Sequence, residues 1–289
     1  MEEVTLGIIL GIVSMLGYGL SNAISKVPAK RLGPIKTTFF RGFFLTILLL
    51  GILFFVIDEL VISWWHIGFV ILLSIGGYIP LLTFYKGLKL GKVGVITPIA
   101  SSSVIITVIL SLIFFKETLN RMQAIAIILI MLGIILISVD FKHFKRSDLF
   151  RLKSGIPYAL ITCVLWGIGF AFFKIPVMVI GPVLTAVILE GGITLWSGLH
   201  MKKTKQKFRI KKSMLLHIIL IAITGLFGTL CFNMGIMYSD VSVVAPIAFS
   251  APLISALYGR VIYNEHLKSK QWLAMAIIIL GVILISYYS

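Results

Sequence analysis

The sequence predicts an all-α membrane protein with ten transmembrane helices, arranged as two inverted repeats of five helices each. Three observations support this prediction. The 289 residues are 59% hydrophobic and 12% charged, with a mean hydropathy of +1.10, whereas a soluble domain has about 25% charged residues. Apolar runs of the roughly 20 residues that a bilayer requires follow one another along the chain. The two halves of the chain also resemble each other.

Short turns separate the apolar runs. Gly33-Pro34 and Gly181-Pro182 end one run and restart a helix in the next, as Gly-Pro pairs typically do. No soluble domain fits between the runs. The predicted membrane spans are residues 4–25, 35–57, 64–85, 93–115, 120–139, 154–174, 182–200, 213–236, 242–262 and 270–288.

A shift of 148 residues aligns the two halves of the chain. It places Lys26 on Lys174 and Glu117 on Glu265, and residues 84–138 align without a gap, with 20 identities in 55 positions. Chance similarity between apolar helices would match Ile, Leu and Val, but would not also match charged residues in one register. The sequence therefore predicts an internal duplication. The expected units are a first five-helix repeat (1–140), a cytoplasmic linker (141–153) and a second five-helix repeat (154–289).

A repeat of five spans must be inverted, because an odd number of crossings makes the second repeat enter the membrane from the opposite side. Inverted repeats are typical of secondary transporters, in which two similar halves exchange conformations. Channels and enzymes can also be duplicated, so this feature favours transport without excluding the other two classes.

Basic residues predict the orientation. The loops after spans 1, 3, 5, 7 and 9 hold 21 of the 26 Lys and Arg residues, and the loops on the other side hold three. Because cytoplasmic loops are enriched in Lys and Arg, we expect the odd-numbered loops in the cytoplasm and both termini outside, in a multi-pass protein of the cell (inner or plasma) membrane. The net charge of +16 is explained by these loops and predicts no binding to nucleic acid. The basic stretch Lys202–Lys212 is expected to lie near anionic lipid head groups.

Two charged residues of opposite sign are predicted deep in the membrane. Arg41 lies seven residues after Pro34, and Glu190 lies eight after Pro182. At about 1.5 Å per residue, each is roughly 10 to 12 Å inside a core of about 30 Å. Such a charge costs about 2.5 to 3.5 kcal/mol on insertion scales, so it needs a cavity or a partner. Two interpretations stay open: a structural ion pair, or a site for a zwitterion or ion.

Polar and aromatic residues at similar depth are candidates for the walls of the same site. A buried Asn needs a hydrogen-bond partner on a neighbouring helix or a solute, whereas Tyr and Trp near span ends usually form an interfacial belt. With Arg41 and Glu190, the candidate substrate-binding residues are Tyr18, Asn22, Tyr78, Trp166 and Asn233.

Four residues are assigned structural roles. Glu117 and Glu265 each precede a helix by two or three residues, where a carboxylate can cap the N-terminus of the helix that follows. Pro98 and Pro246 lie at matching places in spans four and nine. No catalytic constellation, metal-ligand spacing or phosphate loop is present, so we expect neither an enzyme nor a cofactor or metal site.

One pattern resembles a known family. Pro98…Glu117-Thr118-Leu119…Gln123…Gly133 recurs as Pro246…Glu265-His266-Leu267…Gln271…Gly281, which is similar to the paired repeats of the EamA-type carriers of the drug/metabolite transporter superfamily. The resemblance covers essentially the whole chain. It implies a ten-helix fold with a central cavity and transport of small polar or amphipathic metabolites, often as efflux. Members of the family are commonly described with cytoplasmic termini, whereas the charges here predict the reverse.

The sequence thus favours a secondary transporter that moves a small, amino-acid-like metabolite across the bilayer by alternating access. A membrane-embedded enzyme or a channel is the alternative. The substrate, the direction of transport, coupling to protons or a counter-solute, and the choice between monomer and homodimer stay open.

Overall fold

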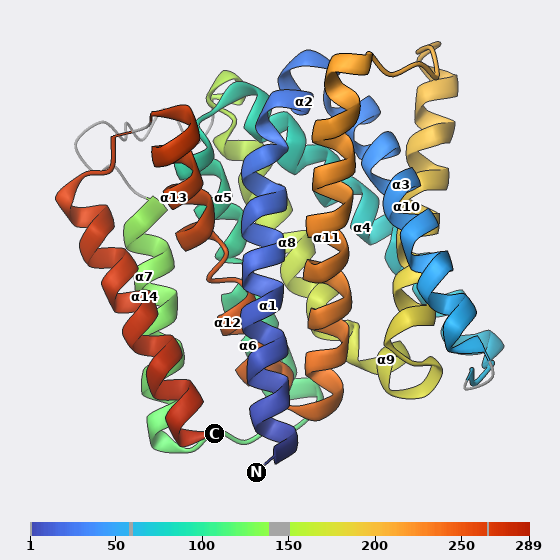
Figure 1. Ribbon diagram of the computed structural model, residues 1–289. Helices are drawn as coiled ribbons and strands as arrows, with labels where there is room; N and C mark the ends of the chain where they lie inside the picture. The colour runs from blue at the N-terminus through green and yellow to red at the C-terminus, as the bar shows by residue number, and fades with distance from the viewer. Residues whose placement is uncertain (1, 58–59, 139–150, 265) are drawn as a thin grey trace.

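The chain folds into a bundle of membrane-spanning helices (Figure 1). The structure is a computed structural model that describes residues 2–57, 60–138, 151–264 and 266–289. Nine helical segments of these residues are long and apolar enough to cross a bilayer. A tenth apolar helix, α7 (Arg121–Ser138), is shorter. The described residues form helices and no strands, so the predicted all-α fold with ten spans is confirmed.

The helices follow the order predicted from the two repeats. In the first repeat they are α1 (Glu2–Ile24), α2 (Lys26–Arg31), α3 (Pro34–Phe55), α4 (Trp64–Leu90), α5 (Val93–Ser101), α6 (Ser103–Phe114) and α7. A short 3-10 turn, η3 (Leu152–Ser154), precedes the second repeat. The second repeat contains α8 (Ile156–Phe172), α9 (Lys174–Ile180), α10 (Pro182–Lys203), α11 (Lys212–Tyr238), α12 (Val241–Ala248), α13 (Pro252–Tyr263) and α14 (Ser269–Tyr288).

Spans one and six are broken at equivalent positions. The break between α1 and α2 is at Ser25, and the break between α8 and α9 is at Phe173, 148 residues later. Pro28 and Pro176 follow each break by three residues. A proline removes the hydrogen bond to the residue four positions earlier and crowds its carbonyl group, which explains why α1 and α8 end where they do.

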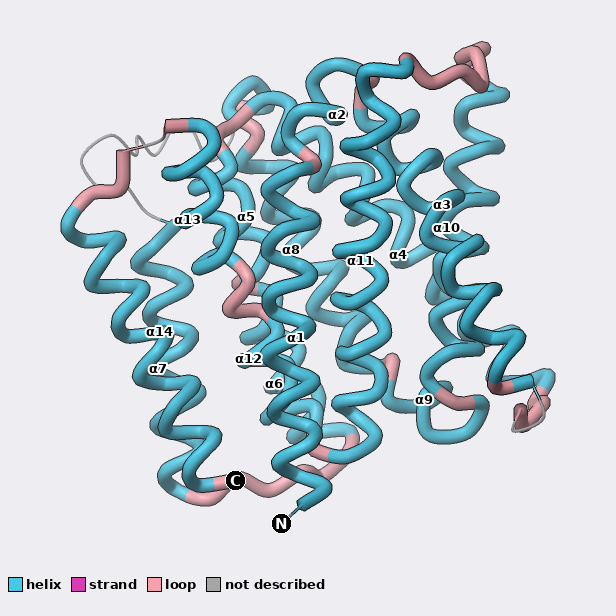
Figure 2. Tube along the Cα trace, viewed as in Figure 1, coloured by secondary structure: helices cyan, strands magenta, loops and turns pink. Residues whose placement is uncertain are grey.

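Spans four and nine are also broken at equivalent positions, near the middle of the bundle. α5 gives way to α6 at Ser102, and α12 is separated from α13 by residues 249–251 (Figure 2). Pro98 and Pro246 lie inside α5 and α12 rather than at the breaks. Their carbonyl oxygens accept hydrogen bonds from the hydroxyl groups of Ser102 and Ser250, at 3.0 and 2.8 Å. The prolines and serines thus form one repeated local structure at each break.

The two repeats are interleaved rather than placed side by side. α1 packs against α11 and α4 packs against α8, and these two contacts are equivalent under the repeat. α3 packs against α10 and α7 against α14, so that each of these pairs joins equivalent helices of the two halves. This arrangement is the one expected of inverted repeats related by an approximate two-fold axis in the membrane plane.

The two ends of the bundle differ in charge. The N- and C-termini lie at one end, and the basic α10–α11 connection lies at the other (Figure 1). Lys202, Lys203, Lys207 and Arg209 of this connection are exposed. Between the two ends, large apolar side chains such as Leu72 and Ile128 face outward, as they do on a surface covered by lipid.

Candidate functional site

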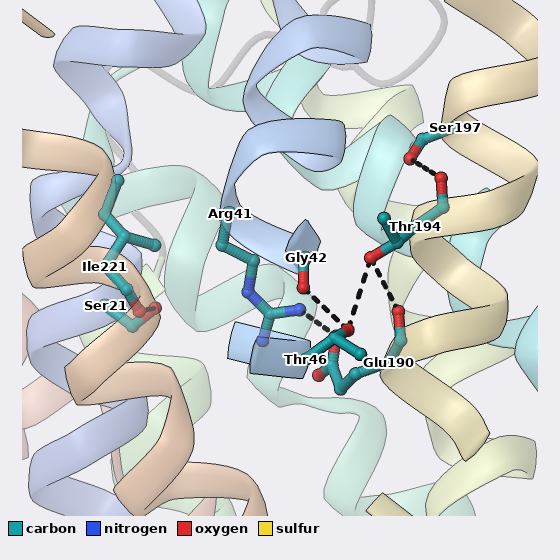
Figure 3. A network of polar contacts seen from close by, with 8 residues as sticks. All are labelled: Ser21, Arg41, Gly42, Thr46, Glu190, Thr194, Ser197 and Ile221. Atoms are coloured by element: carbon teal, nitrogen blue, oxygen red, sulfur yellow. Dashed lines mark hydrogen bonds and ion pairs between the residues drawn. The ribbon is translucent and has the colours of Figure 1, made fainter. Parts of the chain in front are cut away.

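Arg41 and Glu190 form an ion pair at the interface between α3 and α10 (Figure 3). Nη1 of Arg41 lies 2.5 Å from Oε2 of Glu190, and the two side chains are 7% and 4% exposed. The two charges therefore stabilise each other away from water, as ionisable groups within a membrane must. Nε of Arg41 has no hydrogen-bond partner among the described residues.

The ion pair lies close to the symmetry axis of the repeats. One turn beyond each charged residue, or slightly more, are Thr46 and Thr194, which are 148 residues apart in sequence. Their hydroxyl groups lie 3.4 Å from each other, and each also donates a hydrogen bond within its own helix. α3 and α10 are thereby held together at the level where the two charges meet (Figure 3).

A cavity of about 80 Å³ contains the ion pair in its wall. Since one water molecule needs about 10–15 Å³ of such a cavity, it has room for several water molecules. Both repeats contribute to it, and the breaks in spans four, six and nine supply Ser101, Phe173 and Ala251. Irregular backbone within a membrane is tolerated where it lines such a cavity.

Five of the seven predicted site residues lie together on this cavity. They are Tyr18, Asn22, Arg41, Trp166 and Glu190. Tyr18 and Trp166 are 148 residues apart, so the repeat places one ring from each half on the wall.

The other two predicted residues have partners elsewhere. The hydroxyl group of Tyr78 lies 2.5 Å from Nδ1 of His200 and connects α4 to α10. Asn233 is fully buried and its Nδ2 donates to the carbonyl oxygen of Pro182, at 3.2 Å. Neither residue lines the cavity that contains the ion pair.

Several residues of the cavity wall were not predicted from the sequence. Tyr85 is equivalent to Asn233 under the repeat, and this correspondence could have indicated it. Phe170 makes edge contacts with Tyr18, Trp166 and Phe249 and so joins the aromatic side chains of the wall into one cluster. Nothing in the local pattern of a generally apolar helix distinguishes such a phenylalanine from one that faces lipid.

Glu117 caps a helix, but not the helix that was predicted. Its Oε1 and Oε2 accept hydrogen bonds from the backbone N–H groups of Val241 and Ser242, at 3.1 and 2.9 Å. These groups begin α12 of the second repeat. The expectation that Glu117 caps the next helix in sequence, α7, is therefore wrong, because the buried N-terminus of α12 presents two backbone N–H groups to the carboxylate. Glu265 lies outside the described residues.

The N-terminus of α7 is capped by other side chains. The N–H of Gln123 donates to Oδ1 of Asn120 at 2.8 Å, and the N–H of Asn120 donates to Oε1 of Gln123 at 2.9 Å. This reciprocal pair is a capping box. It leaves the Glu117 carboxylate available for α12.

Glu117 also belongs to an ionic cluster that joins the repeats. Nζ of Lys174 lies 2.7 Å from Oε1 of Glu117 and 3.3 Å from Oδ1 of Asp240. The Glu117 side chain is 2% exposed, whereas that of Asp240 is 45% exposed. Burial alone would raise the pKa of Glu117, but the hydrogen bonds from Lys174 and Ser242 outweigh it, so the pKa lies below its ordinary value of 4.5.

Comparison with known proteins gives the family. The EamA-like transporter family matches residues 5–139 and 153–287. An uncharacterised transporter of Helicobacter pylori (strain 26695) is 25% identical, over 99% of this chain and 96% of its own length. An uncharacterised protein of Methanocaldococcus jannaschii is 32% identical over 46% of this chain and 96% of its own length. A protein of known crystal structure has the same fold, with a TM-score of 0.75 and 16% identity over 96% of this chain and 95% of that one.

The two family matches coincide with the two halves of an inverted-repeat helical bundle that encloses a charged cavity at membrane depth. The chain belongs to the EamA-like transporter family and is a multi-pass membrane transporter.

Proposed function

We propose that the protein is a secondary transporter whose substrate is a small amphipathic metabolite with an anionic and a cationic group, such as an amino acid. The observation that carries the proposal is the Arg41–Glu190 ion pair in the wall of a central cavity. The guanidinium group can bind a carboxylate in a bidentate geometry, and a carboxylate can accept hydrogen bonds from an ammonium group. A zwitterion could therefore replace each residue's partner with one of its own charges.

Nε of Arg41 supports this assignment, because it is buried and has no hydrogen-bond partner in the part of the chain that the structure describes. A buried donor without an acceptor costs free energy that a bound acceptor would return. One oxygen of the Glu190 carboxylate is held by Arg41, and a carboxylate can accept more than one hydrogen bond. The pair thus keeps capacity for a ligand even in the state in which the two residues contact each other.

The symmetry of the fold supports alternating access. Arg41 belongs to the first repeat and Glu190 to the second. The helices that carry them, α3 and α10, enter the membrane from opposite faces. If the repeats exchange conformations about their axis, the ion pair stays near the centre while access changes sides. The helix breaks near the cavity are the natural places for this movement.

The repeat units and the orientation are part of the same proposal. We take residues 1–140 and 154–289 as the two units, and the relative from Methanocaldococcus jannaschii, whose aligned length is 46% of this chain, supports a unit of about this size. The basic odd-numbered loops are placed in the cytoplasm of a cell membrane. In a background without Cys163 and Cys231, an impermeant thiol reagent added to intact cells should label Glu3→Cys and not Lys207→Cys. The opposite pattern would reverse the orientation.

Transport is tested in two steps. A thermal-shift screen of amino acids, nucleosides and amines identifies a ligand, and counterflow in proteoliposomes then measures exchange of the labelled compound. We expect saturable uptake of label driven by unlabelled solute inside. A flux that does not saturate would indicate a channel, and a new chemical product would indicate an enzyme.

The ion pair is tested by a double-mutant cycle of Arg41→Met and Glu190→Gln, with stability and counterflow measured separately. Removal of one partner of a buried pair leaves an uncompensated charge and destabilises by about 3–5 kcal/mol. We expect each single variant to lose stability and transport, and the double variant to regain stability only. Recovery of transport by the double variant would show that the pair is structural and that the binding site is elsewhere.

A further inference from the structure

The central cavity reaches the side of the helix bundle between α4 and α8. Its wall includes Leu73 and Gly76 of α4 and Leu165 and Gly169 of α8, and Gly76 is exposed. We call the gap between these four residues the lateral opening. A Cβ atom added at either glycine would have no neighbouring side chain or helix within 4 Å in the described part of the chain, so neither helix fills the gap.

The two glycines face each other across the helix pair. α4 and α8 touch where the Thr83 and Thr162 hydroxyl groups lie 2.8 Å apart and where Thr162 donates to the carbonyl oxygen of Pro80. α4 and α8 are antiparallel in the bundle. Gly76 lies seven residues before Thr83 on α4, and Gly169 lies seven residues after Thr162 on α8. Because the helices are antiparallel, both glycines lie on the same side of the threonine contact. Seven residues are close to two helical turns, so the faces that touch at the threonines carry glycines at the next level.

The equivalent interface in the other half is closed. Under the repeat Gly169 corresponds to Ser21 of α1, and Oγ of Ser21 donates to the carbonyl oxygen of Ile221 on α11 at 3.3 Å. Seven residues earlier on α1, Oγ of Ser14 donates to the carbonyl oxygen of Gly228 on α11 at 2.8 Å. Among the described residues, the α4–α8 interface is therefore open at the level of the cavity, whereas the equivalent α1–α11 interface is closed.

The lateral opening lies at membrane depth. Gly76 is 12 residues from the start of α4, and Gly169 is 13 residues from the start of α8. At about 1.5 Å per residue, both are roughly 18 to 20 Å from an end of the bundle. The neighbouring outward side chains are apolar, including Leu72 and Val164, which are 62% and 48% exposed. The opening therefore leads to the hydrocarbon region of the bilayer.

The cavity behind the opening is suited to a solute with two unlike parts. Trp166, Phe170, Phe173 and Phe249 supply an aromatic wall. Arg41, 6% exposed, supplies a charged group whose Nε has no hydrogen-bond partner among the described residues. The cavity therefore combines a charged hydrogen-bond donor with an aromatic wall, and these two surfaces suit the charged and the apolar part of one solute.

We propose that the lateral opening admits the apolar group of an amphipathic solute from the bilayer while its charged groups bind Arg41 and Glu190. This rests on the proposed function and narrows it. The substrate class is an amphipathic zwitterion that partitions into the membrane, and the path to the site runs between α4 and α8 as well as through water.

The first test measures the opening without any substrate. In a variant whose only tryptophan is Trp166, reconstituted in phosphatidylcholine vesicles with acyl chains brominated at mid-length, we expect strong quenching of fluorescence. Gly76→Leu with Gly169→Leu should reduce this quenching at least about twofold, because the new side chains fill the gap. Leucine is a better helix former than glycine, so folding should be retained. Gly76→Leu alone serves if the double variant fails to fold.

A matched control exists on the same helix. Gly68 of α4 is exposed and does not line the cavity, and a Cβ atom added there would likewise meet none of the described residues within 4 Å. Gly68→Leu should leave the quenching of Trp166 unchanged. Equal quenching in all variants would show that the chains do not reach Trp166 through this opening, and would overturn the proposal.

The second test varies the apolar group, with 2-aminobutanoate to 2-aminooctanoate as probes. Each added methylene that enters an apolar site strengthens binding about fourfold. We expect this gain in the wild type and in Gly68→Leu. In the Gly76→Leu/Gly169→Leu variant we expect the gain per methylene to stop at the shorter members.

The outcomes separate this proposal from the proposed function. If the short members bind and the gain per methylene is the same in every variant, the lateral opening is not used, while the transport site stands. If no member binds although Trp166 is quenched, the zwitterion site and the amphipathic substrate both fail. If quenching persists at saturating 2-aminooctanoate, a lipid chain rather than the solute occupies the opening.

Discussion

The substitution Glu117→Gln should destabilise the protein through a helix in the other repeat. The carboxylate accepts hydrogen bonds from Lys174, Val241 and Ser242. Glutamine keeps the shape of the side chain but has one carbonyl oxygen and no charge. It therefore cannot accept hydrogen bonds from the Lys174 ammonium group and from both backbone N–H groups at once. A hydrogen bond to a charged group contributes about 1.5–3 kcal/mol. Since the three share one carboxylate and are not additive, we expect a loss of about 2–4 kcal/mol.

The pH dependence has a definite sign. The pKa of Glu117 is lower in the folded protein than its ordinary value of 4.5, so folding weakens proton binding to this group. Its contribution is complete above a pH of about 4.5 and is lost as the pH falls through the folded-state pKa. The wild type should therefore lose more stability than Glu117→Gln between pH 6 and about pH 3.

The assay is thermal unfolding in detergent, with Glu3→Gln as the control. Glu3 is an exposed carboxylate in the first turn of α1, so its substitution removes the same charge and should change stability by about 0.5 kcal/mol or less. Binding of the ligand from the thermal-shift screen should be nearly unchanged in folded Glu117→Gln. A stable variant with a selective loss of ligand affinity would refute the structural role and place Glu117 in the binding site.

Two further substitutions test the packing of the bundle and the boundary of the site. Gly133→Val should strongly destabilise the α7–α14 contact, because a Cβ atom at Gly133 would lie 2.5 Å from Cγ1 of Ile278; Gly51→Val, where a Cβ meets nothing within 4 Å, should change thermal stability little. Tyr78→Phe removes the hydrogen bond to His200 and should cost about 1 kcal/mol, with counterflow retained. A fall in ligand affinity at normal stability would instead extend the site to Tyr78.

Part of the site could be predicted because membrane burial makes it visible in sequence. A charge in an apolar span has few explanations, so Arg41 and Glu190 were identified, and their matched depth indicated that they face each other. Tyr18, Asn22 and Trp166 were found by the same reasoning. The membrane depth predicted for Tyr78 and Asn233 made them equally good candidates for the site. Their helices, however, turn the side chains toward His200 and Pro182, and depth alone does not specify the direction of a side chain.

The sequence by itself determined the class of fold. Apolar runs of bilayer length, the 148-residue repeat and the odd number of spans per repeat leave little freedom, because a helix is the simplest way to satisfy the backbone in lipid. The proline positions in spans one and six also determined where those helices break. Each of these properties depends on residues that are neighbours in the chain.

Only the tertiary structure decided which surfaces meet. It assigned Glu117 to the N-terminus of α12 rather than to α7, and it left Gly76 and Gly169 unfilled while Ser21 closed the equivalent interface. In a membrane every helix is apolar on most of its surface, so the hydrophobic pattern does not say which face contacts protein and which contacts lipid. Close packing and a few cross-helix hydrogen bonds make that choice, and they join residues that are far apart in the sequence.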